Sequence, residues 1–209
     1  EGRVIGVVEG FAGLFKWEIS LLGQPAHSGT TPMSSRRDAL QGLGRVLCGM
    51  ESVLETHGSA TSVCNIGRVE ALPGAANVVP GKVDFSLEVR DVDASALDRL
   101  RDRFRQFLQD VAAENNLDIL MEVVSEISPQ PCAKEIVETV HQVAEDLQHP
   151  LLRMPSGAVH DSQIMGKIAP SGIFFVPSRG GRSHCPEEWT EGSQIEAGCQ
   201  VLINTLYRL

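Results

Sequence analysis

The chain lacks the features of a nucleic-acid-binding protein, a membrane protein or a disulfide-stabilised secreted domain. It has no run of basic residues and a formal net charge of −9, so neither nucleic acid nor an anionic membrane is expected as a partner. No apolar run approaches the roughly 20 residues that a membrane-spanning helix needs. The cysteines are scattered, odd in number and without a C-x-x-C pair: Cys48, Cys64, Cys132, Cys185 and Cys199. These absences predict reduced thiols in a cytoplasmic protein.

What is present is the composition of an ordinary globular protein. Its 209 residues, 42% of them hydrophobic, suffice for one large or two small domains. The sequence starts at Glu1 without a methionine and runs directly into an apolar segment. We therefore expect the chain to be part of a longer protein.

Apolar periodicity predicts the order βαββαβ between residues 15 and 127. Strands are expected over residues 16–21, 62–71, 82–90 and 119–127. Two amphipathic helices are expected to begin after Ser34 or Ser35 and after Asp93 or Ser95. The first should bury a stripe of apolar residues spaced by three and four: Leu40, Leu43, Leu47, Met50 and Leu54. Such an α+β unit forms one antiparallel, four-stranded sheet with both helices on one face, which leaves the other face or an edge strand for a second copy.

The pattern changes after residues 128–131. Helices are expected over 134–147, 162–168 and 191–209, and strands over 151–154 and 172–177. The last helix should bury Ile195, Leu202 and Leu206. Alternating helices and continuous apolar strands predict part of a parallel α/β layer, too small to be complete.

The densest group of candidate functional residues is the segment 23–33, GQPAHSGTTPM. Its glycines and prolines predict an ordered loop that presents His27 to a ligand. The flanking hydroxyl groups make the loop polar enough to bind a small anion or a carbonyl group. The alternative is a turn histidine that only hydrogen-bonds the backbone.

Two further polar residues each have a functional and a structural interpretation. Asn77 either presents its amide to a ligand or stabilises its own turn. Arg90 ends an alternating strand, on the face opposite the apolar residues. It is either a solvated charge or a bidentate receptor for a carboxylate.

Two histidines stand out in the C-terminal part. His184 follows an apolar strand, at the strand end where α/β proteins bind ligands, and Glu187 or Glu188 could orient its second ring nitrogen. A lone histidine is weak evidence for a metal. His160 precedes Asp161 at a predicted helix start, where Asp161 alone would serve as an N-cap.

Together these motifs resemble the dinuclear-zinc amidohydrolases that include N-carbamoyl-L-amino-acid hydrolase, allantoate amidohydrolase and β-ureidopropionase. The matching segments span nearly all of the chain: 6–10 (GVVEG), 23–33 with 37–39 (RDA), 74–81 (GAANVVPG), 88–91 (EVRD), 156–161 (SGAVHD), 175–178 (FVPS) and 183–188 (SHCPEE).

The resemblance implies a subunit in which a zinc-binding α/β domain is interrupted by a smaller βαββαβ lid that forms a homodimer. Residues 1–12 would end one segment of the catalytic domain, 13–127 would be the lid, and 128–209 the C-terminal part of the zinc domain.

The resemblance also assigns roles to single residues. It implies that His27 polarises the scissile carbonyl as a catalytic residue, and that Asn77 and Arg90 hold the substrate carboxylate, some of them across the dimer. His184 would be a zinc ligand. We place His160 among the substrate-binding residues, with Val159 where the family pattern has glycine.

The implied reaction is hydrolysis of a ureido or amide C–N bond in a carboxylate-bearing small molecule, an N-carbamoyl-L-amino acid or allantoate. The full-length enzyme would use two zinc or manganese ions, which activate a water and polarise the carbonyl. The other metal ligands and the general base would precede Glu1. Because a catalytic zinc needs about three protein ligands, we expect no tightly bound metal and no activity in this chain alone. Two alternatives remain: a non-catalytic dimerisation module, and a dipeptidase or aminoacylase of the same superfamily.

Overall fold

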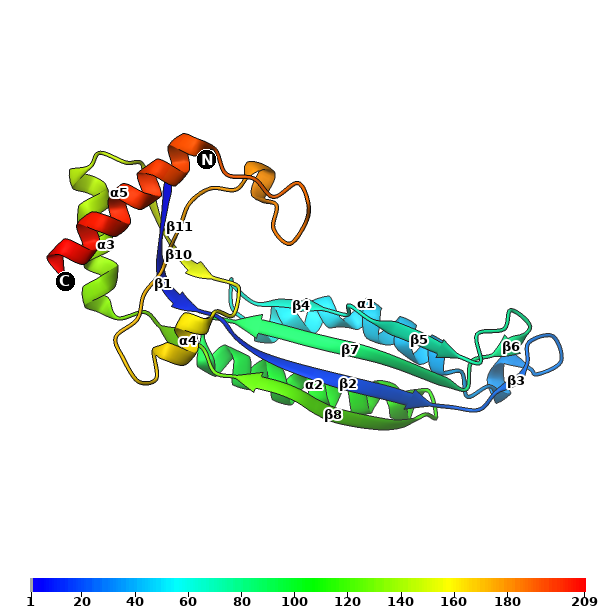
Figure 1. Cartoon of the computed structure of the whole chain (residues 1–209). Coiled ribbons are helices and arrows are strands. Elements are labelled where there is room, and N and C mark those ends of the chain that lie inside the picture. Colours follow the sequence, from blue (N-terminus) through cyan, green and yellow to red (C-terminus); the bar gives the residue numbers. More distant parts are fainter. Residues whose placement is uncertain (1) are drawn as a thin grey trace. The chain divides into compact units, whose positions relative to one another are not determined.

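The computed structural model describes residues 2–209, which form two compact units (Figure 1). The central unit is continuous and spans Gly13–Pro129. The split unit combines the residues up to Ala12 with Gln130–Leu209.

The central unit is built on an antiparallel sheet. Its long strands are β2 (Gly13–Leu22), β7 (Lys82–Asp91) and β8 (Asp118–Ile127), in the order β7-β2-β8. Two short strands, β4 (Val63–Asn65) and β5 (Val69–Leu72), both pair with β7 and share the fourth position of the sheet. The predicted strand over residues 62–71 is therefore broken in two.

Alternation along the long strands gives this sheet one apolar and one charged face. Alternate residues of β2 and β7, such as Trp17, Ile19 and Phe85, are buried against α1 (Ala39–His57) and α2 (Ala94–Glu114). The opposite face carries ion pairs: Arg68–Glu18, Lys82–Asp84 and Arg90–Glu88. The predicted α+β unit with both helices on one face is confirmed.

The start and the buried face of α1 differ from expectation. A 3-10 turn, η1 (Met33–Ser35), comes first, and Asp38 is the N-cap because its carboxylate accepts the N–H groups of Leu40 and Gln41. The buried residues are Ala39, Gly42, Leu43 and Val46. Leu40 and Leu47 are 44% and 50% exposed, so the predicted stripe was partly wrong. The helix packs so closely against the sheet that mainly small residues of α1 face the core.

The split unit has β1 (Ile5–Phe11) at the centre of a small sheet. β10 (Leu151–Ser156) pairs with β1 in parallel, as predicted, whereas β11 (Phe174–Phe175) and β9 (Gln130–Pro131) pair with it in antiparallel. Two helices that contact each other, α3 (Lys134–Asp146) and α5 (Gly192–Arg208), lie side by side in Figure 1. A short helix, α4 (Asp161–Met165), follows β10.

The final helix buries a different face from the one predicted. Ile195, Leu202 and Leu206 are exposed, whereas the buried residues of α5 are Ala197, Gly198, Val201 and Thr205. A Cβ atom on Gly198 would lie 2.7 Å from the side chain of Val176. Close packing, rather than the largest apolar residues, therefore sets the orientation of α5. None of the helices in residues 2–209 is long and apolar enough to cross a membrane.

Candidate functional site

The structure brings His27 and Asn77 together at one end of the central unit. Strand β3 (Ala26–His27) pairs in antiparallel with β6 (Val78–Val79), and His27 lies opposite Val78. The main-chain N–H of Ser28 donates to the carbonyl oxygen of Asn77 at 3.0 Å. Two loops that are distant in sequence therefore lie side by side (Figure 1).

The ring of His27 is exposed, and one of its nitrogens is already engaged. The N–H of Gly29 donates to Nδ1 at 3.0 Å, so Nδ1 is an acceptor and the proton of the neutral ring lies on Nε2. The backbone contact expected of a turn histidine is thus present, yet it leaves Nε2–H as a donor for a ligand. A neutral donor in this place can stabilise charge on a carbonyl oxygen.

Sequence reasoning missed Arg36. Its Nε donates to the carbonyl oxygen of Thr31 at 3.1 Å and its Nη2 to that of Ser28. The neighbouring Arg37 points elsewhere, with hydrogen bonds to Asn116 O and Asp118. The only signal in the sequence was the Arg-Arg pair before the helix cap, and it did not say which arginine turns back to the loop.

Arg90 lies near the opposite end of the central sheet. It is half-buried, and its guanidinium contacts the Glu88 carboxylate through Nε at 2.8 Å and Nη2 at 2.7 Å. From Lys82, where β7 begins near the His27 end, to Arg90 the strand rises about 27 Å at ~3.4 Å per residue. Within one copy of the central unit, Arg90 is therefore separated from the surface formed by His27 and Asn77.

His160 is packed into the split unit. It occupies the N-cap position of α4, and its Nε2 lies 3.1 Å from Ser156 Oγ. The ring contacts Phe11 and Phe175, with centroid distances of 5.6 and 5.8 Å. These contacts give His160 a structural role, and its part in substrate binding stays a prediction.

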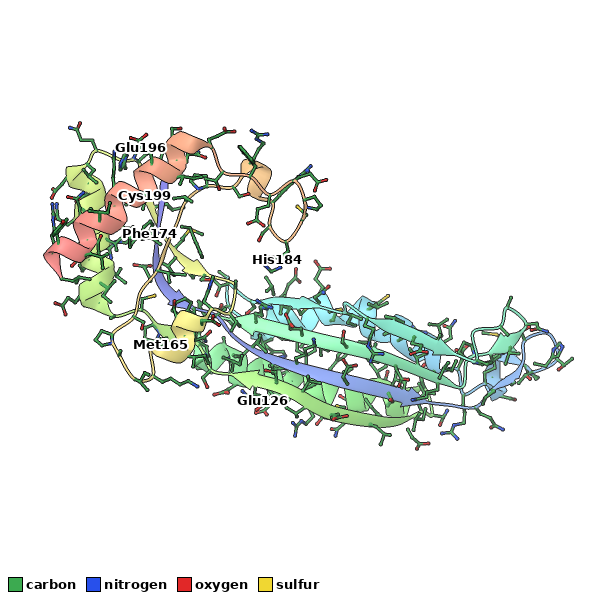
Figure 2. All side chains as sticks on the ribbon, in the orientation of Figure 1. Glu126, Met165, Phe174, His184, Glu196 and Cys199 are labelled. Carbon is green, nitrogen blue, oxygen red and sulfur yellow. The ribbon has the colours of Figure 1, made fainter. Side chains whose placement is uncertain are left out.

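His184 is exposed on the loop between β11 and α5, near the tip of that loop in Figure 2. Its φ angle is 58°, which is unusual for a residue other than glycine. The main-chain N–H of His184 donates to Glu188 Oε2 at 2.9 Å. Glu188, one of the two glutamates that could orient the ring, therefore holds the backbone of this residue.

A metal centre does not form from the described part of the chain alone. Within residues 2–209, no group of three or more histidine, cysteine, aspartate or glutamate side chains is arranged to hold a metal ion. His184 would supply one ligand, whereas a catalytic zinc needs about three from the protein.

The class of protein to which this fold belongs is shown by a family match. Residues 6–208 match the peptidase family M20/M25/M40, and the chain belongs to this family.

Several relatives carry the names of amidohydrolases, the enzymes that the sequence resembles. N-carbamoyl-L-amino acid amidohydrolase from Geobacillus stearothermophilus is 32% identical over 208 residues, which are 100% of this chain and 50% of the relative. Allantoate amidohydrolase from Escherichia coli (strain K12) is also 32% identical over 208 residues, with the same coverage. The crystal structure of an amidase of the hydantoinase/carbamoylase family from Burkholderia multivorans superposes with a TM-score of 0.92 and 32% identity, over 98% of this chain and 49% of that one. The chain thus spans about half the length of the relatives it matches.

Proposed function

We propose that the protein to which this chain belongs hydrolyses a ureido or amide C–N bond in a small molecule that carries a carboxylate, such as an N-carbamoyl-L-amino acid or allantoate. The observation that carries this proposal is that relatives with both names match the chain along its full length. The exposed His27 turn is consistent with it, because acyl hydrolysis needs a donor for the carbonyl oxygen.

In this proposal His27 is the donor to the scissile carbonyl. As water attacks, negative charge grows on that oxygen, and the Nε2–H of a neutral imidazole stabilises it. The side-chain amide of Asn77, beside the same turn, helps to hold the substrate.

Arg90 fits the role of carboxylate receptor only if two copies of the central unit combine. A two-fold axis that pairs equivalent edges in antiparallel places the far end of one sheet beside the near end of the other. Arg90 would then approach His27 and Asn77 of the partner copy. This geometry supports a homodimer formed through the central unit.

The edge formed by β4 and β5 suits this role better than the edge formed by β8. It exposes the apolar side chains Val63, Val69 and Leu72, and α1, which contacts β4, exposes Leu40 and Leu47. Strand β8 also exposes apolar side chains, Leu120, Val123 and Val124. Its neighbouring helix α2, however, carries charged residues, among them Arg101, Asp102 and Arg105, where α1 exposes leucines. We therefore assign the dimer contact to β4, β5 and α1.

We also propose that the whole protein depends on a divalent metal, zinc or manganese, with His184 as one ligand. The described residues do not complete such a site, so a 209-residue chain should bind zinc weakly and show no turnover by itself. The free cysteines in the described residues support a reducing compartment, the cytoplasm.

A substrate panel tests the proposal on the whole protein loaded with metal. Ammonia release from N-carbamoyl-L-amino acids or allantoate supports it. Release of free amino acid from acyl donors or dipeptides, without ammonia, would instead identify an aminoacylase or dipeptidase. No turnover of any of these substrates would leave the dimerisation module as the better interpretation.

A further inference from the structure

The side chain of Arg36 ties together the turn that carries His27. Its guanidinium is half-buried and binds two carbonyl oxygens of that turn, Ser28 O and Thr31 O. The backbone of Arg36 is itself held, because its N–H donates to Met33 O at 3.3 Å. The guanidinium thus connects the segment between η1 and α1 with an exposed turn.

One of these contacts controls the His27 ring through a single peptide group. The carbonyl of Ser28 and the N–H of Gly29 belong to the same planar trans peptide, so they point in opposite directions. When Arg36 holds Ser28 O, it also fixes the direction of the Gly29 N–H. That N–H is the group that donates to Nδ1 of His27.

We propose that Arg36 is a positioning residue for His27. By orienting the peptide between Ser28 and Gly29, it keeps the neutral ring in the tautomer that carries its proton on Nε2. Arg36 contacts no reacting atom in this account. The proposal rests on the role proposed above for His27 as the donor to the scissile carbonyl, but the tautomer itself can be measured without any turnover.

The tautomer is measured by ¹⁵N NMR of the histidine rings in the 209-residue chain, at about pH 8.5, where an ordinary histidine is neutral. His27→Gln identifies the His27 signals. In the unmodified chain we expect Nδ1 of His27 to be an unprotonated acceptor and Nε2 to be protonated. Arg36→Ala should produce a mixture of both tautomers. Arg36→Lys should produce a smaller change, because the ammonium group is still a charged donor but cannot hold both carbonyls in one plane.

Arg37→Ala is the matched control. It removes a guanidinium of equal charge one residue away, whose partners are Asn116 and Asp118. It should leave the His27 signals unchanged. If Arg36→Ala unfolds the chain, Arg36→Lys decides the question by the same measurement. Unchanged His27 signals in a folded Arg36 variant, or an equal change in Arg37→Ala, would overturn the proposal.

Kinetics on the whole, metal-loaded protein give a second readout. Arg36→Ala should lower kcat about 10-fold and change KM little, since a misdirected donor loses stabilisation that exists only in the transition state. Arg37→Ala should leave both constants unchanged. If the protein hydrolyses ureido acids but Arg36→Ala leaves the tautomer unchanged, the positioning role of Arg36 is refuted and the proposed function stands. A tautomer change in a protein that hydrolyses no ureido acid would refute the proposed function and leave the positioning role intact.

Discussion

The N–H of Ser28 donates to the carbonyl oxygen of Asn77 at 3.0 Å, and this bond joins the two loops that carry the candidate site of the central unit. Neither loop is held by long secondary structure, since β3 and β6 have two residues each. The site therefore depends on a few main-chain contacts and on the residues at the base of the two loops.

Gly23 is one of those residues, and its replacement should damage the base of the loop. Its N–H donates to Gly81 O at 2.8 Å, and a Cβ atom there would lie 1.9 Å from Arg37 O. Because the obstacle is main chain, we expect Gly23→Ala to lower the free energy of unfolding by at least about 1–3 kcal/mol. Urea unfolding measures this. Gly44→Ala, in open space on α1, is the control and should raise stability by about 0.5–1 kcal/mol. Equal effects of the two changes would contradict the crowding at Gly23.

The long strands of the central unit could be predicted because one face of the sheet is buried and the other is charged. Because of this asymmetry, apolar residues recur at every second position of β2 and β7, and the burial of these residues in the structure follows the same period. The helix faces were harder to predict. On α1 and α5 the residues nearest the core include Gly42, Gly198 and Ala197, and a hydrophobicity pattern gives such small residues little weight.

The candidate residues could be proposed from the sequence one by one, but their arrangement could not. The glycines and prolines around His27 mark a loop, yet nothing in that segment states that Asn77 lies beside it. The two-residue strands that join them are too short to show a period. The separation of Arg90 from His27 follows from its position near the far end of β7, which becomes meaningful only once the sheet order is known.

Asp91 should make the stability of the central unit depend on pH in the acid range. The carboxylate is fully buried and accepts hydrogen bonds from Ser59, Thr61, Ser62 and the N–H of Asp93. Burial alone would raise its pKa, but the hydrogen bonds, led by that of Ser62, outweigh burial and hold the pKa of Asp91 below its usual value. A carboxyl with a depressed pKa stabilises the fold above its unfolded pKa of about 3.9. That stabilisation is lost as the pH falls through the folded pKa.

The measurement is urea unfolding of Asp91→Asn and the unmodified chain between about pH 7 and pH 3. At pH 7 the variant should be less stable by about 1–3 kcal/mol, because a charged acceptor of several hydrogen bonds is gone. As the pH falls below about 4, towards the folded pKa of Asp91, the difference in stability should shrink. Asp102→Asn, exposed on α2, is the control and should follow the unmodified chain at every pH. A constant gap between Asp91→Asn and the unmodified chain would show that ionisation of Asp91 is not responsible.

The edge of the central unit that is formed by β4 and β5 should be the dimer contact. Leu47→Glu places a charge at an exposed position of α1, the helix that contacts β4, and should convert dimers into monomers, since burying an unpaired charge is costly. Sedimentation velocity at micromolar concentration measures the change. Leu206→Glu on α5 is the control, because Leu206 is also exposed but belongs to the split unit. If Leu206→Glu separated the copies and Leu47→Glu did not, α5 would be the interface.

His27 and Arg90 should fail in different ways when each is replaced in the whole, metal-loaded protein. The donor on His27 acts on charge that develops only as water attacks, so His27→Ala should lower kcat by about 10²–10³ with little change in KM. Arg90 would hold a carboxylate that is present in ground and transition states alike, so Arg90→Ala should mainly raise KM.

Neither side chain lies in the apolar core, so both variants should fold. Steady-state kinetics on a ureido acid, with metal content and unfolding measured in parallel, separate the two effects. A folded His27→Ala protein with normal kcat would leave His27 as a turn residue. An unchanged KM in Arg90→Ala would move the search for the carboxylate receptor to Arg68, Arg179 or Arg182.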